Sequence, residues 1–176
     1  FISFGDDITG GEWLEAPLAK IITDYLQGGG YVYLEGAAIF GMFQADNPLF
    51  FELFGMESAV YQQAANPIDS LGGQPDALTN EMLFTGNSQI SNRYLDKFEP
   101  SPDAVAAFIE SDFGIVGVQY SVPESHRSFC FAYCLAYLTD GEFPNTREEL
   151  LNRILNFFDI YTSVPVTPEP AAISCK

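Results

Sequence analysis

Positively charged side chains are scarce in this sequence. Its 176 residues contain 7 Lys and Arg against 24 Asp and Glu, which gives a formal net charge of −17 at pH 7. Such a surface repels phosphate backbones and anionic lipid headgroups, so we expect neither nucleic acid nor a membrane surface as a partner. Two explanations of the acidity stay open. It either keeps a Phe-rich protein soluble in a salty or calcium-rich medium, or it serves to bind cations such as Ca²⁺.

Long apolar runs and a signal peptide are also missing. The longest uninterrupted apolar run, residues 129–138, is about half of the roughly 20 residues that a membrane-spanning helix needs, so it predicts a core segment and no membrane insertion. The chain does not open on a basic region followed by an apolar one. Localisation must therefore be inferred indirectly.

Cysteine is rare, with only three residues. Cys130 and Cys134 form neither a CxxC pair nor a zinc spacing, and four residues of separation give poor disulfide geometry. We expect both to be buried thiols, whereas Cys175, in the tail, could form only a long-range or intermolecular disulfide.

Aromatic residues are abundant, with 16 Phe and 9 Tyr in a sequence that is 47% hydrophobic. This composition predicts one folded domain with a sizeable core.

The start of the chain predicts a βαβ unit. Phe1 to Phe4 has the composition of a strand, and the following apolar residues recur at helical spacing from Leu14 to Tyr25. Gly28 to Gly30 ends that helix, and Tyr31 to Leu34 predicts a strand covered on both faces. Such a unit is expected to be parallel and right-handed.

The rest of the chain predicts further elements of both kinds. An antiparallel hairpin is expected near 104–120, and Thr146 with Glu149 forms a capping box before a final helix. The predicted elements are short helices at 37–43 and 48–54, loops and short strands covering one sheet edge at 64–103, strands at 105–109, 114–120 and 127–133, and a helix at 147–158. Residues 1–161 then form the domain, and the proline-spaced residues 162–176 form a linker that implies something attached beyond it.

One segment resembles a known family. The block from Ala19 to Ala38, which contains Tyr25-Leu26-Gln27-Gly28-Gly29-Gly30 and Tyr31-Val32-Tyr33-Leu34-Glu35-Gly36, resembles class I glutamine amidotransferase-like domains, in particular the divergent ones appended to secreted bacterial peptidases and cell-surface proteins. The later strand His126 to Tyr133 fits the same pattern. The resemblance implies a flavodoxin-like α/β fold, a three-layer sandwich with a mainly parallel central sheet. It also implies an extracellular or cell-surface location, and a domain whose first strands are missing, because the strand matching Phe1 to Phe4 usually comes third.

The resemblance also locates the expected chemistry. Catalytic members of the family carry a Cys nucleophile at the turn after the strand that matches Tyr31 to Leu34, but here that turn reads Glu35-Gly36-Ala37-Ala38-Ile39. Without a Cys, Ser or Thr there, the resemblance implies a non-catalytic structural or interaction module of a larger protein. Glu35 and His126 are the catalytic candidates that remain. His126 falls near the family's His, although a lone His in a charged loop is more often a solvated surface residue.

Carboxylates predict an alternative function at one sheet edge. Asp6 and Asp7 follow the first strand and Glu35 ends the adjacent one, at the carboxyl edge where open α/β sheets bind ligands. Three converging carboxylates could hold Ca²⁺ or Mg²⁺ for a metal-assisted hydrolase, with His126 as a further member. Asp6 and Asp7 could instead cap the following helix. Another expectation concerns partners, which would be other domains of the same polypeptide or another chain at an open sheet edge.

Overall fold

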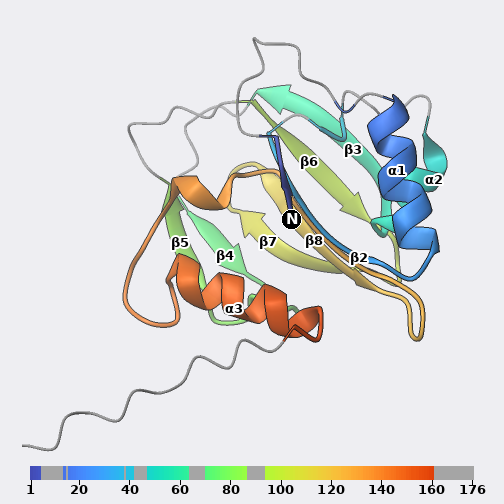
Figure 1. The fold of residues 1–176 in the computed structure, drawn as a ribbon. Helices are drawn as coiled ribbons and strands as arrows, with labels where there is room; N and C mark the ends of the chain where they lie inside the picture. The colour runs from blue at the N-terminus through green and yellow to red at the C-terminus, as the bar shows by residue number, and fades with distance from the viewer. Residues whose placement is uncertain are drawn as a thin grey trace, which may run out of the picture.

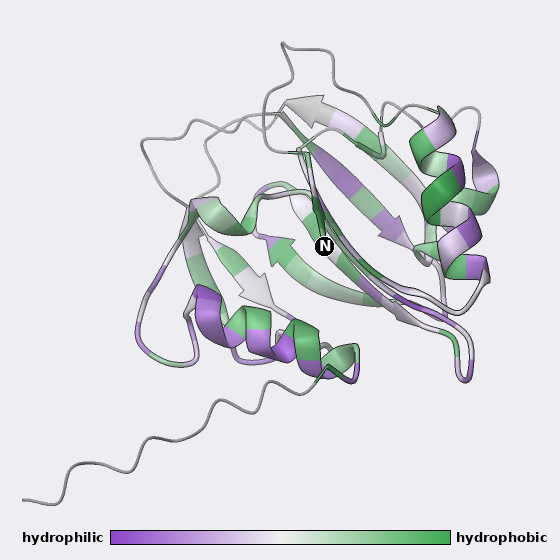
Figure 2. Ribbon diagram, viewed as in Figure 1, coloured by the Kyte–Doolittle hydropathy of each residue, from purple (hydrophilic) through white to green (hydrophobic). Residues whose placement is uncertain are grey.

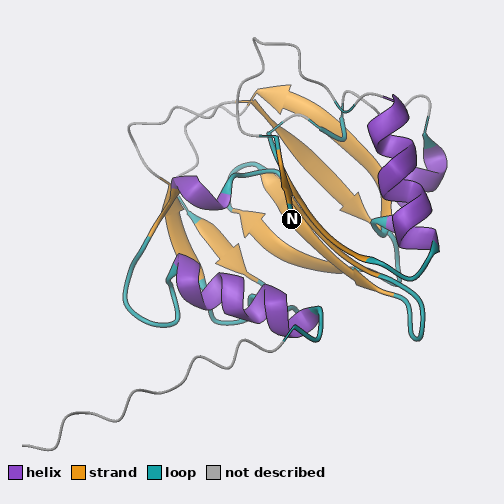
Figure 3. Ribbon diagram, in the orientation of Figure 1, coloured by secondary structure: helices purple, strands orange, loops and turns teal. Residues whose placement is uncertain are grey.

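The computed structural model describes residues 1–4, 14, 16–37, 39–41, 47–63, 70–86 and 94–160. This part of the chain is rich in strands and has three α-helices (Figure 3). The elements in chain order are β1 (Ile2–Ser3), α1 (Ala16–Gln27), β2 (Tyr31–Glu35), α2 (Pro48–Leu53), β3 (Met56–Gln63), β4 (Leu71–Gly73), β5 (Leu83–Gly86), β6 (Tyr94–Pro100), β7 (Val105–Glu110), β8 (Gly114–Ser121), β9 (Arg127–Phe131), η2 (Leu135–Tyr137), β10 (Leu138–Thr139) and α3 (Arg147–Phe157).

Eight of the described strands form one curled, mixed sheet in the order β1-β2-β9-β8-β7-β4-β5-β10 (Figure 1). The pairs β1–β2 and β2–β9 are parallel, and every later pair along the sheet is antiparallel. Strands β3 and β6 form a separate antiparallel pair, which contacts the main sheet through β6 and β8. Most of the described chain is therefore β structure.

This architecture corrects the predicted fold class. A flavodoxin-like three-layer α/β sandwich with a mainly parallel sheet was expected, but parallel pairing ends at β9 and the described helices are few and short. The reason lies in residues 64–103, which were interpreted as an excursion over one edge. Their strands instead enter the structure, since β4 pairs with β7 and β5 in the main sheet while β6 pairs with β3.

The βαβ unit at the N-terminus forms as its sequence predicts. β1 runs parallel to β2, with Ile2 opposite Leu34, and α1 connects them. The buried side of α1 consists of Ala19, Ile22 and Leu26. Gly29, at φ +86°, ends the helix in a conformation that favours glycine. Ile21 and Tyr25 belong to the apolar residues that were expected to form the buried face of this helix. That expectation is wrong for these two residues, because they are 64% and 57% exposed.

The last helix packs on the opposite side of the molecule from α1 and α2, near β4 and β5 (Figure 1). Thr146 Oγ1 accepts the backbone N–H of Glu149, as an N-cap does. The reciprocal half of the predicted capping box is absent, because the Glu149 carboxylate binds Arg153 and the Thr146 N–H donates to the Pro144 carbonyl. Figure 2 shows hydrophobic and hydrophilic stretches alternating along α3. The buried residues of this helix are Leu150 and Ile154.

The sheet edges beside α3 and at β1 differ. β10 covers β5 at Thr85 and Gly86, and the Asn145 side chain accepts the Leu83 N–H at 2.7 Å, so this edge is partly closed. At the other edge, Phe4 N donates to the Glu35 carbonyl. Successive residues of a strand direct their N–H groups to opposite sides, so the Ser3 N–H points away from β2. Among the described residues no strand covers β1 on that side.

Aromatic side chains form much of the core. Phe40 lies within 5.3–5.9 Å, ring centroid to ring centroid, of Phe50, Phe51, Phe54 and Phe98. Phe50 and Phe51 are 1% and 3% exposed, so the aromatic residues of α2 pack inside the domain. This cluster fixes α2 and the turn after β2 on the β3–β6 pair.

Candidate functional site

Glu35 lies at the carboxyl end of β2, as predicted, but its carboxylate is buried and bonded. Tyr33, two residues earlier on the same face of the strand, donates its hydroxyl to Glu35 Oε2 at 2.5 Å, and Leu135 N donates to the same oxygen at 2.8 Å. Burial and then the Glu35 charge hold the pKa of Tyr33 well above its ordinary value. Glu35 thus joins β2 to the η2 segment that follows β9.

His126 is buried, which corrects the expectation of a solvated surface residue. It is 6% exposed, with Nε2 at 3.1 Å from the Leu53 carbonyl oxygen and Nδ1 at 3.3 Å from Ser125 Oγ. Because a carbonyl oxygen only accepts, Nε2 carries the hydrogen in this contact. Ser128 Oγ donates to the same carbonyl at 3.0 Å, so both side chains fasten the last residue of α2 to β9.

The two catalytic candidates lie at opposite ends of the same strand pair. Glu35 is opposite Phe131 at one end of the β2–β9 pairing, and His126 directly precedes Arg127, which is opposite Tyr31 at the other. Five residues of extended chain span roughly 16 Å. Glu35 and His126 therefore cannot act on one bound group or hold one metal ion together.

The predicted metal site is only partly described. Asp6 and Asp7 lie outside the described residues, so their convergence with Glu35 stays a prediction. Within the part that the structure describes, no group of three His, Cys, Asp or Glu side chains is placed to hold a metal ion.

Cys130 and Cys134 are both buried, as expected. Cys130 is fully buried on β9, with Sγ at 3.7 Å from the Val118 carbonyl oxygen, and burial raises the pKa of its thiol far above the usual range. Cys134 is 3% exposed, whereas Cys175 lies outside the described residues. Because the nucleophile is the thiolate, the raised pKa of Cys130 makes it a poor one.

Sequence reasoning missed the most unusual polar group, Asp96. It is fully buried on β6, and its carboxylate accepts backbone N–H groups from the turn after β2: Phe40 N at 2.6 Å, Gly41 N at 3.0 Å, and Ile39 N. Burial raises its pKa to about 7, although the three N–H groups pull the value the other way. Residues 39–41, at the end of the segment where the resembled family carries its nucleophile, are thus held by a carboxylate from a distant strand.

The local sequence gives a weak signal for Asp96. Asp96 lies between Leu95 and Lys97, in a segment that was interpreted as an excursion of loops and short strands over one sheet edge. Only the long-range pairing of β6 with β3 places it under the turn. A charged residue on the buried side of a strand marks a bonded or functional group.

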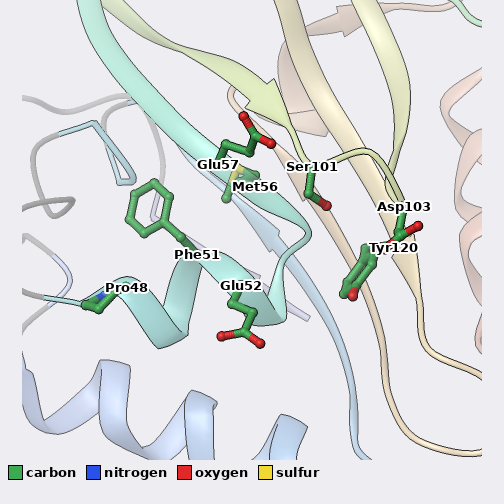
Figure 4. A pocket seen from close by; sticks show the side chains of 8 residues that line it. All are labelled: Pro48, Phe51, Glu52, Met56, Glu57, Ser101, Asp103 and Tyr120. Atoms are coloured by element: carbon green, nitrogen blue, oxygen red, sulfur yellow. The ribbon is translucent and has the colours of Figure 1, made fainter.

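A pocket of about 400 Å³ opens where α2, β3 and β8 meet the turn that precedes β7 (Figure 4). Its lining combines apolar surface with oxygen atoms. Among the lining residues, Glu52, Glu57 and Asp103 are exposed carboxylates, whereas Phe51 and Met56 are buried apolar side chains. The other lining residues are Pro48, Ser101 and Tyr120. No basic side chain lines it, so this pocket suits a positively charged group that also carries apolar surface.

Comparison with known proteins defines the fold and no more. No protein-family model matches the chain, and no curated protein matches its sequence. Among solved structures, a segment of a cold-adapted β-galactosidase from Rahnella sp. R3 superposes with a TM-score of 0.56 at 8% identity, covering 85% of this chain and 22% of that one. The N-terminal domain of mmIFT52 gives a TM-score of 0.49 at 12% identity over 86% and 74% of the two chains. The chain therefore spans about a fifth of the β-galactosidase with which it shares its fold.

None of the described helices is long and apolar enough to cross a membrane.

Proposed function

We propose that this chain is a non-catalytic interaction module of a larger secreted or cell-surface protein. The observation that carries the proposal is how its polar groups are used. Glu35 bonds Tyr33 and Leu135, His126 bonds Leu53, and each of the two joins elements of the fold. They lie at opposite ends of β2 and β9, so neither supports the other as a base or an acid.

The pocket beside α2 is the surface that best fits a partner. Its three exposed carboxylates repel anions, and the net charge of −17 strengthens that preference over the whole molecule. The Tyr120 ring adds a face on which a guanidinium or ammonium group can stack. The partner we propose is a Lys- or Arg-rich segment of another domain of the same polypeptide or of another chain.

The resemblance to glutamine amidotransferase-like domains remains a proposal, now limited to the segment that carries it. The parallel β1–α1–β2 unit and the absence of Cys, Ser and Thr from residues 35–39 support a relative that lacks the nucleophile. The flavodoxin-like sheet that the resemblance implied is not part of it.

A binding experiment tests the pocket directly. A fluorescent Arg-rich peptide is titrated into the wild-type domain and into the double variant Glu52→Gln/Asp103→Asn. We expect the variant to bind at least about tenfold more weakly, because two of the three pocket charges are lost. The control Asp112→Asn/Glu142→Gln has the same net charge but changes exposed carboxylates outside the pocket, and it should bind like wild type.

Equal weakening in both double variants would mean that the peptide senses only the overall charge, and the pocket proposal would fail. If the pocket variant binds normally but Ser3→Pro does not, the interface lies at the β1 edge, where the Ser3 N–H points away from β2. Hydrolysis of an ester or glycoside substrate that disappears in Glu35→Gln or His126→Gln would overturn the non-catalytic assignment itself.

A further inference from the structure

The outer side of α1 carries exposed apolar side chains. Ile21 and Tyr25 lie one helical turn apart and are largely exposed, and Leu18, one turn before Ile21, is partly buried. We call these three residues the outer stripe of α1. Leu49 of α2, a helix that contacts α1, is exposed as well, and both helices lie on the outside of the molecule (Figure 1). Large apolar side chains that gather on one face mark an interaction surface.

The spacing of the outer stripe fits a helix as its partner. Its members are separated by three and then four residues, which is the spacing of the narrow apolar seam along which two helices pack. The opposite side of α1 is already buried in the domain. The stripe is therefore a second seam on the same helix, and its side chains remain in contact with water.

The charges of α1 are balanced, in contrast to those of the whole chain. The helix contains one Lys and one Asp, and Lys20 Nζ lies 2.8 and 2.6 Å from the two carboxylate oxygens of Asp24. A basic partner therefore finds no unpaired carboxylate on this helix. A second copy of the chain, with its net charge of −17, would meet least repulsion at a face that has no surplus of negative charge.

We propose that α1 is the surface through which two copies of this chain form a symmetric dimer, with the two helices antiparallel and their outer stripes in contact. The proposal is independent of the cationic partner proposed for the pocket beside α2.

Two-fold symmetry makes the charges of this face complementary to themselves. With the axis at the level of Ile22, midway between Lys20 and Asp24, the Asp24 of the second copy lies opposite Lys20 of the first, and the reverse holds as well. Lys20 and Asp24 are four positions apart and share one flank of the outer stripe, and the rotation places the two flanks side by side. Four charges of alternating sign then line the contact.

The contact is small, which sets the concentration range of the test. α1 has 12 residues and is roughly 18 Å long, so two such helices bury less area than a standard protein interface. Association is therefore followed by sedimentation equilibrium up to about 1 mM chain, where a Kd of about 1 mM still leaves about half of the chains in dimers. About 150 mM NaCl screens the repulsion between distant carboxylates to a range of roughly 8 Å.

The first comparison removes one apolar side chain from the stripe. We expect the wild-type chain to dimerise and Ile21→Ser to weaken the dimer at least about tenfold, because each copy loses buried apolar surface. Leu83→Ser is the matched control, since Leu83 is similarly exposed but lies on β5. This control should dimerise like wild type.

The second comparison tests the two-fold geometry by exchanging charges. Lys20→Glu and Asp24→Lys each place like charges opposite one another in a dimer of identical copies, so both should associate more weakly than wild type. Asp24→Lys is the sharper case, because it makes the chain less acidic and would otherwise favour association. An equimolar mixture restores opposite charges at both contacts, so its average mass should exceed that of either variant alone at the same total concentration.

Three results would overturn the proposal. The first is a wild-type chain that stays monomeric up to about 1 mM. The second is a dimer that Ile21→Ser and Leu83→Ser weaken equally, or that only Ser3→Pro weakens, which would place the contact at the β1 edge. The third is a mixture of the two charge variants that associates no better than its components, which would exclude the antiparallel pairing of Lys20 with Asp24.

Discussion

The Leu53 carbonyl group shows how single polar atoms hold this domain together. It ends α2, a helix of six residues, and it accepts both His126 Nε2 at 3.1 Å and Ser128 Oγ at 3.0 Å. Carbonyls at a helix C-terminus lack partners inside the helix, so two side chains from the β9 region satisfy this one. The ring of His126 also packs edge-on against Tyr120.

Replacing His126 should therefore weaken folding. We expect His126→Ala to lower the free energy of unfolding by about 2–3 kcal/mol, from the lost hydrogen bond and the space left behind the ring. Ser128→Ala, which leaves the His126 contact in place, should cost about 1 kcal/mol. Urea denaturation followed by circular dichroism gives both values. A cost within about 0.5 kcal/mol for His126→Ala is typical of a surface residue and would contradict the buried role.

The residue scale also shows why the candidate site was only half predictable. Glu35 lies where its position after an apolar strand placed it, because strand ends follow from local sequence. Its partner Leu135 is 100 residues away, and nothing local announces that contact. His126 looked solvated because Glu124 and Arg127 flank it, yet the docking of α2 buries it. Asp96 escaped notice for the same reason, since its burial depends on a distant turn.

At the scale of elements, local patterns predicted those elements whose signals are local. The helix before Gly28 to Gly30, the paired strands β7 and β8, and the helix after Thr146 all lie close to their predicted bounds. The expected helix at 37–43 is wrong where the structure describes it, because residues 39–41 form the turn held by Asp96.

Strands β3 to β6 were harder to predict because their partners are distant in sequence. In the main sheet, Gly72 pairs with Ile109 on one side and with Leu83 on the other. Ile109 lies 37 positions further along the chain (109 − 72), and Leu83 lies 11 positions further (83 − 72), beyond a loop. Short strands such as β4, with the sequence Leu-Gly-Gly, carry almost no β propensity of their own. Tertiary pairing decides their structure, and that decision changed the fold class from a parallel sandwich to a mixed, curled sheet.

The N-cap of α3 offers a test of one element. Thr146 Oγ1 accepts the Glu149 N–H at 3.1 Å, and Glu148 and Glu149 add favourable charge in the first turn. We expect Thr146→Ala to reduce the free energy of unfolding by about 1 kcal/mol, because one helix N–H loses its partner. Thr139→Ala, at an exposed strand position, is the matched control and should cost less. Equal effects in chemical denaturation would argue against a capping role.

At the scale of the whole molecule, negative charge is the dominant electrostatic feature. Four described ion pairs, Lys20–Asp24, Arg127–Asp159, Arg147–Asp140 and Arg153–Glu149, offset little of it. All of their side chains are at least 23% exposed, so water screens each pair and its contribution to stability is small. The remaining carboxylates repel one another in the compact state more than in the unfolded chain.

Salt should consequently stabilise the domain. Raising NaCl from about 20 mM to about 500 mM shortens the screening length from roughly 20 Å to a few ångströms and weakens this repulsion. We expect the midpoint of urea denaturation at pH 7.5 to rise, and KCl to have the same effect as NaCl. A midpoint that falls would show that the ion pairs outweigh the repulsion. A rise with Ca²⁺ at millimolar concentrations, but not with Mg²⁺ or Na⁺, would instead indicate a specific cation site.

Strand β4 ends in two adjacent glycines whose surroundings are unequal. A Cβ at Gly73 would lie 1.8 Å from the Thr79 carbonyl oxygen, whereas one at Gly72 would meet its nearest neighbour at 3.8 Å. Selection acting on this domain would therefore keep glycine at position 73 and let position 72 drift. The same repeated letter in the sequence records a requirement in one place and a mere tolerance in the next.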